Sequence, residues 1–132
     1  MIVLEDVLKP GEVFTFQLTI SDSDTADSIG NTGVRVFSTP ALLMHVENTS
    51  SLWAARRLPE GYSPVGISVD LKHTGAVPVG GEVIITSRVL SVRRKVISYE
   101  FHASYQGREI SHGTYQQAII DLQEFLAKNN AM

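Results

Sequence analysis

The sequence contains no cysteine, and this absence excludes disulfide bonds, thiol catalysis and cysteine-ligated metals. No apolar run approaches the roughly 20 residues that a membrane-spanning helix needs. The start of the chain lacks a basic segment followed by an apolar one, so we expect no secretory signal and, by default, a cytoplasmic protein. The net charge of −3 lacks the positive excess typical of proteins that bind nucleic acid or anionic membranes, and we expect neither partner.

What the chain does have is the composition of an ordinary folded domain. Its 132 residues, of which 43% are hydrophobic and 19% charged, are enough to bury a sizeable core. No internal repeat, linker or low-complexity segment divides them. We therefore expect a single domain over residues 1–132.

Alternation of apolar and polar residues predicts that most of the chain forms strands. The first predicted strand spans Val13 to Ile20, and a loop rich in Asp, Ser and Gly follows it. The second half of the chain contains four more strands and a short terminal helix. Their expected bounds are Val65–Thr74, Glu82–Val92, Val96–Tyr105 and Ile110–Ile120 for the strands, and Asp121–Lys128 for the helix.

The one long helical pattern lies between the first strand and the other four. We expect Thr39 to cap its N-terminus, Pro40 to occupy the first helical position, and the helix to end near Arg57, before Pro59. At about 100° per residue, Glu47 falls on the face that carries apolar and small residues, where a carboxylate is unexpected. One helix beside a largely antiparallel sheet indicates an α+β architecture.

His73 lies near the end of the second predicted strand, in phase with the apolar residues of that strand. It should therefore point to the core side. A buried imidazole or carboxylate is costly without a partner or a purpose. If Thr39, Glu47 and His73 all face one pocket, their hydroxyl, carboxylate and imidazole form a set that can perform acyl transfer.

Several short motifs accompany these three residues along the chain. They are Phe37-Ser38-Thr39-Pro40 followed by Glu47, then Val65-Gly66 and His73, then Pro78-Val79-Gly80, then Gly113-Thr114. Together with the order of the elements, they resemble the fluoroacetyl-CoA-thioesterase-like branch of the hotdog acyl-CoA thioesterases. The resemblance extends from about Pro10 to Phe125. It implies a hotdog fold, in which an antiparallel sheet wraps around one long central helix and protomers pair as homodimers.

The resemblance also implies an activity, the hydrolysis of a small acyl-CoA thioester to the free acid and CoA. No metal is implied, and no cofactor besides the CoA of the substrate. The family's catalytic set maps onto Thr39, Glu47 and His73, and Gly66 should lie close to the acyl group. From the chemistry of these groups, we expect Glu47 to act as base or nucleophile with Thr39 as its partner, and His73 to donate a proton and stabilise the oxyanion. Whether Glu47 or the Thr39 hydroxyl is the nucleophile stays open at this point.

Two features differ from the usual pattern of that family. The family often has a basic residue after the Gly-Thr pair of the last strand, whereas here Gly113-Thr114 continues as Tyr115-Gln116-Gln117, so we expect no charge-based contact there. The loop from Gly30 to Gly33 lacks the aromatic lid of the fluoroacetyl-specific members. Specificity for fluoroacetyl-CoA is therefore not expected.

Two other functions fit the same residue types. A non-catalytic acyl-CoA-binding or sensing module would use the same pocket without turnover. An enoyl-CoA hydratase or dehydratase of a related fold would use an Asp-x4-His pair, whereas the nearest pair here, Asp70-x2-His73, points to opposite faces of a strand. Structural roles also stay open: Thr39 as a helix cap, Glu47 as a carboxylate bonded across a dimer interface, and His73 as a core histidine.

Overall fold

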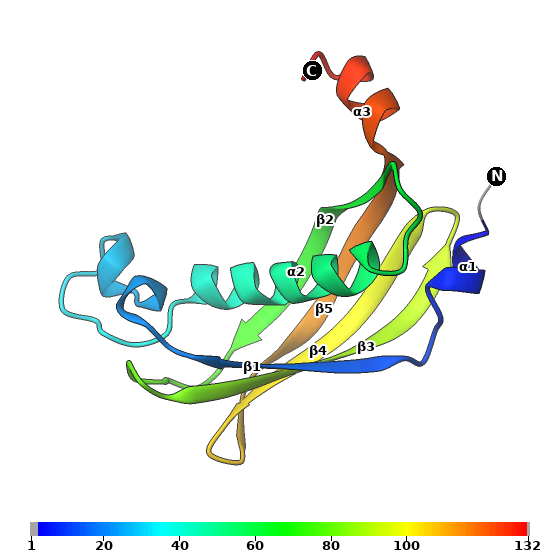
Figure 1. Ribbon diagram of the computed structural model, residues 1–132. Coiled ribbons are helices and arrows are strands. Elements are labelled where there is room, and N and C mark those ends of the chain that lie inside the picture. The colour runs from blue at the N-terminus through cyan, green and yellow to red at the C-terminus, as the bar shows by residue number, and fades with distance from the viewer. Residues whose placement is uncertain (1–2, 132) are drawn as a thin grey trace.

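The computed structural model describes residues 3–131, and its elements follow the predicted order (Figure 1). In this range the strands are β1 (Val13–Thr19), β2 (Tyr62–His73), β3 (Glu82–Arg93), β4 (Val96–Tyr105) and β5 (Arg108–Asp121). The long helix is α2 (Thr39–Ala55). Short elements are α1 (Leu4–Val7), the 3-10 turns η1 (Asp22–Asp24) and η2 (Asp27–Ile29), and α3 (Leu122–Lys128).

The strands pair antiparallel in the spatial order β1-β3-β4-β5-β2. Tight turns join β3 to β4 and β4 to β5, because these strands are neighbours both in the chain and in the sheet. β1 and β2 form the two edges, and the chain between them contains α2, which lies across the concave face of the curved sheet (Figure 1). This arrangement is the hotdog fold, so the α+β prediction is confirmed.

The core lies between α2 and the concave face of the sheet. Its large side chains, each 6% exposed or less, include Leu42, Val46 and Trp53 from the helix and Ile85, Ile97 and Tyr99 from the sheet. Burying one such side chain contributes about 1.5–3 kcal/mol, so this contact holds the helix in place. No helix within residues 3–131 combines the length and the apolar character that crossing a membrane requires.

A bulge in β2 changes the predicted alternation of that strand. The register of its pairing with β5 shifts directly after Gly66. Because one extra residue reverses which side chains face the core, the rows on either side of the bulge are out of phase. His73 lies opposite the buried Ser111, on the inner row, as predicted. Before the bulge, Gly66 and not Val65 occupies this row, opposite the buried Gln117.

The N-cap of α2 is also one residue earlier than predicted. Ser38 has extended backbone, and its side-chain oxygen accepts a hydrogen bond from the backbone N–H of Ala41 at 3.1 Å. Serine and threonine cap helices by the same interaction, and the pattern of residue types did not distinguish them. Thr39 is consequently the first helical residue, and Pro40 the second. The prediction that Thr39 is the cap is wrong, and its hydroxyl has no capping role.

Candidate functional site

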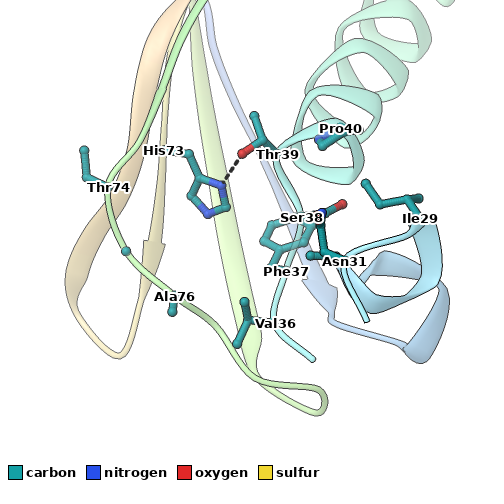
Figure 2. Close-up of a pocket in the computed structure, with 12 residues that line it drawn as sticks. Ile29, Asn31, Val36, Phe37, Ser38, Thr39, Pro40, His73, Thr74 and Ala76 are labelled. Carbon is teal, nitrogen blue, oxygen red and sulfur yellow. Dashed lines mark hydrogen bonds between the residues drawn. The ribbon is translucent and has the colours of Figure 1, made fainter. Parts of the chain in front are cut away.

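Thr39 and His73 meet at the N-terminal end of α2. Thr39 is the first residue of the helix and His73 is the last residue of β2. Their side chains share a hydrogen bond, with 2.9 Å between Thr39 Oγ1 and His73 Nδ1 (Figure 2). Because Ser38 supplies the helix cap, the Thr39 hydroxyl is available for this bond.

The imidazole of His73 is half-buried, and its second nitrogen is unpartnered. The ring packs edge-on against Phe37, with 6.2 Å between centroids, and within residues 3–131 its Nε2 finds no hydrogen-bond partner. Burial lowers the pKa of His73, and the backbone of Gly75, which favours the protonated ring, opposes this shift without cancelling it. The ring is therefore neutral at pH 7. When the Thr39 hydroxyl donates to Nδ1, the neutral ring carries its hydrogen on Nε2 and is a donor there.

A cavity of about 560 Å³ adjoins the Thr39–His73 pair. The loop that precedes α2 forms one wall, with Ile29, Val36 and Phe37, and the segment that follows β2 forms the other, with Thr74 and Ala76 (Figure 2). His73 is the one ionisable side chain among the described residues that line this space. A mostly apolar cavity of this size, with few polar groups at one end, is typical of small-molecule sites.

Glu47 lies about two turns further along α2 and contacts different residues. Its Oε2 accepts a hydrogen bond from the hydroxyl of Tyr115, in β5, at 2.6 Å. Gly66 of β2 lies directly against this bond. A Cβ atom added at Gly66 would be 2.2 Å from Glu47 Oε2 and 2.6 Å from the Tyr115 hydroxyl. Only glycine therefore lets the carboxylate come this close to the strand.

Within one protomer, the Thr39–His73 pair and the Glu47–Gly66 pair lie apart. Gly66 and His73 lie on the same strand, and at about 3.3 Å per residue the strand separates their Cα atoms by roughly 20 Å. In the part of the chain that the structure describes, Glu47 forms no hydrogen bond with Thr39 or His73. The structure brings Thr39 to His73 and Glu47 to Gly66, but it does not bring the two pairs together. The partner of Thr39 in the protomer is His73 and not Glu47.

The residues that hold Glu47 were not predicted from the sequence. Gln117, one inward position after Tyr115, is completely buried, and its side-chain oxygen accepts a hydrogen bond from the Tyr99 hydroxyl at 2.7 Å. Its amide nitrogen donates to the Ser51 hydroxyl at 2.9 Å and, more weakly, to the Tyr115 hydroxyl at 3.4 Å. A glutamine on the buried row of a strand needs such partners. The position of Gln117 on the inward row of the strand, together with Tyr115, was the signal that could have identified this network.

The buried carboxylate of Asp24 holds the loop wall of the cavity in place. His45 Nε2 lies 2.9 Å from Asp24 Oδ1, and the backbone N–H of Ser21 donates to Asp24 Oδ2 at 2.9 Å. Burial by itself would raise the pKa of Asp24, but the hydrogen bonds from Ser21 and His45 hold it below its usual range. These contacts tie η1 to α2 and thereby position the loop that precedes the helix.

Ionisable residues on the outer face of the sheet form exposed pairs. His112 lies 3.2 Å from Glu109, and Asp70 lies 3.4 Å from Lys72. The Asp70 side chain is 72% exposed and lies on the face opposite to His73, so the pair that a hydratase would need does not form. Among residues 3–131 there is no cluster of three or more His, Asp or Glu side chains that could hold a metal ion.

The chain is similar to known thioesterases over most of its length. The sequence signature of the fluoroacetyl-CoA-specific thioesterases, FlK, matches residues 20–123. The fluoroacetyl-CoA thioesterase of Streptantibioticus cattleyicolor is 27% identical over 131 residues, which cover 95% of this chain and 94% of that protein. A solved structure of the fluoroacetyl-CoA thioesterase FlK superposes with a TM-score of 0.86 at 26% identity, covering 93% of this chain and 96% of that one.

The fold itself extends to more distant proteins. A hot-dog-like protein from Thermanaerovibrio acidaminovorans superposes with a TM-score of 0.87 over 97% of both chains, although the two sequences are only 18% identical. At that identity the similarity concerns the fold alone. The architecture is thus shared with a protein of much lower sequence identity.

Proposed function

Because the chain belongs to the fluoroacetyl-CoA-specific thioesterase family, we propose that this thioesterase hydrolyses a small acyl-CoA thioester to the free acid and CoA. The observation that carries the proposal is the 2.9 Å hydrogen bond between Thr39 Oγ1 and His73 Nδ1 at the edge of a mostly apolar cavity. Ligands of the family enzyme support it. One variant of FlK is described in complex with fluoroacetate and CoA, and another with acetyl-CoA.

His73 is suited to act on the thioester carbonyl. Its neutral ring offers the Nε2 hydrogen to the carbonyl oxygen, which becomes negative as the nucleophile adds to the carbon. Thr39 fixes the tautomer and the orientation of the ring through its bond to Nδ1. The carbon–sulfur bond then breaks, and the CoA thiolate leaves and takes up a proton.

Glu47 is the proposed base. It takes a proton from the water that adds to the carbonyl carbon, or it adds to that carbon itself and the resulting anhydride is hydrolysed. Either role requires the carboxylate to reach the acyl carbon beside His73. Since roughly 20 Å of strand separates Gly66 from His73 in one protomer, we place Glu47 of one protomer beside the Thr39–His73 pair of a second. Gly66 then borders the acyl group from the side of Glu47.

An exposed apolar edge supports a homodimer. β2 is an edge strand, and its Ile67 and Val69 are 53% and 42% exposed. Met44 and Leu52 of α2 are 46% and 55% exposed. A long edge strand with apolar side chains favours pairing with another strand, and a two-fold axis would let β2 of two copies pair with each other. Such pairing would bring the two halves of the site from different protomers close together.

The activity is tested by thiol release from acetyl-CoA and other short acyl-CoA esters. We expect Glu47→Ala to lower kcat by about 10²–10⁴-fold, the range for loss of a general base. Glu60→Ala removes a carboxylate from the exposed turn after the helix and is the matched control, with turnover expected to stay at the wild-type level. Equal turnover by Glu47→Ala and the wild type would overturn the assignment.

The shared site is tested by mixing two inactive variants. Glu47→Ala and His73→Ala are unfolded together and refolded as a mixture. If each site takes Glu47 from one protomer and His73 from the other, mixed dimers contain one intact site, and about a quarter of the wild-type activity returns for a random 1:1 mixture. If both residues act within one protomer, the mixture stays inactive. Light scattering on the unmixed wild type gives the mass of the assembly independently.

The remaining predictions from the sequence keep their status as predictions. We propose that residues 1–132 form a single hotdog thioesterase-like domain, and that the enzyme acts in the cytoplasm. Separation of cell fractions, followed by immunoblotting for this chain, tests the location.

A further inference from the structure

The carboxylate of Glu47 is held by a neutral donor. Its side-chain hydrogen bond within the described residues comes from Tyr115, at 2.6 Å. None of the ion pairs of residues 3–131 includes Glu47. Arg57, just beyond the end of α2, pairs instead with Glu12 at 2.8 Å. The charge of Glu47 is therefore oriented by a hydroxyl and is not neutralised by a cation.

Tyr115 is itself held firmly in place. It is 2% exposed and stacks on Tyr99, with 6.0 Å between ring centroids and 21° between ring planes. Burial, together with the hydrogen bond to Glu47, raises the pKa of Tyr115 far above its usual range, so the hydroxyl keeps its proton at any working pH. A tyrosine hydroxyl has one proton to donate, and this proton goes to Glu47.

Three hydrogen bonds in series run through Tyr115 towards Glu47. The Tyr99 hydroxyl donates to Gln117, the amide of Gln117 donates to the Tyr115 oxygen, and Tyr115 donates to the carboxylate. The same amide nitrogen also donates to Ser51, which lies one turn after Glu47 on α2. Successive hydrogen bonds with one direction polarise each other, so this chain strengthens its last bond.

From this geometry we propose that Tyr115 is a positioning residue for Glu47, which orients the carboxylate in place of a charged partner. The inference rests on the proposed function, since it assumes that Glu47 acts on the thioester. Gly66 completes the arrangement, because any side chain there would displace either the carboxylate or the hydroxyl. Proton abstraction from water requires a carboxylate that is held in one orientation.

The test is Tyr115→Phe, which removes the donor but preserves the ring and its stacking. We expect kcat to fall about tenfold while KM stays within about twofold, because Tyr115 acts on the base and not on substrate binding. The acid limb of the kcat profile against pH should move up by about one pH unit, because the ionised carboxylate has lost its hydrogen-bond donor. Rates are expressed per folded protein, from circular dichroism of each variant.

Tyr99→Phe is the matched control. It removes a hydroxyl from the same aromatic stack. Tyr99 is as buried a residue as Tyr115, but its hydroxyl donates to Gln117 and does not touch Glu47. We expect a similar loss of thermal stability, with the acid limb moved by about 0.3 pH units or less. Equal movement of the acid limb in both variants would mean that loosening of the stack explains the effect, and the positioning role would be overturned.

Two outcomes separate this inference from the proposed function. If Glu47→Ala is inactive but Tyr115→Phe keeps the wild-type kcat and acid limb, the tyrosine only stabilises the fold. The positioning role then fails and the proposed function stands. If Glu47→Ala retains full turnover, the proposed function fails first and the role of Tyr115 fails with it.

Discussion

The two ends of the candidate site satisfy their polar groups in opposite ways. Beside the cavity, Thr39 and His73 share one hydrogen bond, and Nε2 of His73 is buried without a partner among the described residues. Further along α2, Glu47 is bonded to Tyr115, and Gln117 supports that bond from behind. A buried polar atom without a partner lowers the free energy of unfolding by about 1–3 kcal/mol. The Thr39–His73 end has this cost, and a bound carbonyl oxygen would remove it.

This difference suggests a division of roles. The end that leaves a ring nitrogen unpartnered is suited to receive the substrate, and the end where the carboxylate is hydrogen-bonded is suited to hold a reactive group in one orientation. Each prediction below concerns one end of the site and leaves the other intact.

The largest effect is expected at the unpartnered end. His73→Ala removes the donor, so kcat should fall by about 10²–10⁴-fold in thiol-release assays. Its thermal stability should change little, because the variant also removes a buried nitrogen that has no partner. His102→Ala, at an exposed histidine of β4, is the control with unchanged turnover. A loss of less than tenfold in His73→Ala would show that this imidazole is not central.

A smaller effect is expected when the network at Glu47 is broken. Gly66→Ala places a methyl group where the carboxylate and the Tyr115 hydroxyl lie, so one of them must move. We expect kcat to fall about tenfold to a hundredfold, and the free energy of unfolding to fall by about 1–3 kcal/mol, as for other overpacked sites. Ser68→Ala, an exposed neighbour beyond the bulge, is the control. Wild-type behaviour of Gly66→Ala would contradict the tight packing at this point.

Ser38 and Thr39, neighbours at the start of α2, should have different roles. Loss of the Ser38 hydroxyl should affect stability, and loss of the Thr39 hydroxyl should affect catalysis. Ser38→Ala removes the helix cap and should lower the free energy of unfolding by about 1 kcal/mol, with turnover within about twofold of the wild type. Thr39→Ala removes the partner of His73 and should lower kcat about tenfold without a comparable loss of stability. Urea titration and thiol release measure the two quantities. If Thr39→Ala lowered the stability and Ser38→Ala lowered kcat, Thr39 would be the cap after all.

The smallest effect concerns the stability of the protein at mildly acidic pH. Burial lowers the pKa of His73 in the folded state below its ordinary value of 6.5. In the window below that value the unfolded chain binds more protons, so the contribution of His73 to stability is complete above about pH 6.5 and decreases as the pH falls. Urea midpoints measured between pH 8 and pH 5 should therefore decrease less steeply for His73→Gln than for the wild type. Identical slopes would show that this ring is not desolvated.

The strands and the long helix could be predicted because their periodicities are local. The predicted bounds of β4, Val96–Tyr105, are those of the structure, and the inward direction of His73 is confirmed. Other bounds differ: β2 begins at Tyr62 and not at Val65, and α2 ends at Ala55 and not near Arg57. Two further local details were not predicted. Alternation does not reveal the extra residue after Gly66, and residue type does not distinguish Ser38 from Thr39 as the cap, because both hydroxyls satisfy the same N–H donors.

The sequence by itself determined the fold and the family of this protein, because periodicity and motif spacing are properties of the chain. The tertiary structure decided which polar groups meet. The strand order β1-β3-β4-β5-β2 places Tyr115 of β5 beside Gly66 of β2, and α2 crosses the sheet so that Glu47 contacts both. No spacing along the chain encodes this contact, because strand pairing brings together residues that are distant in sequence.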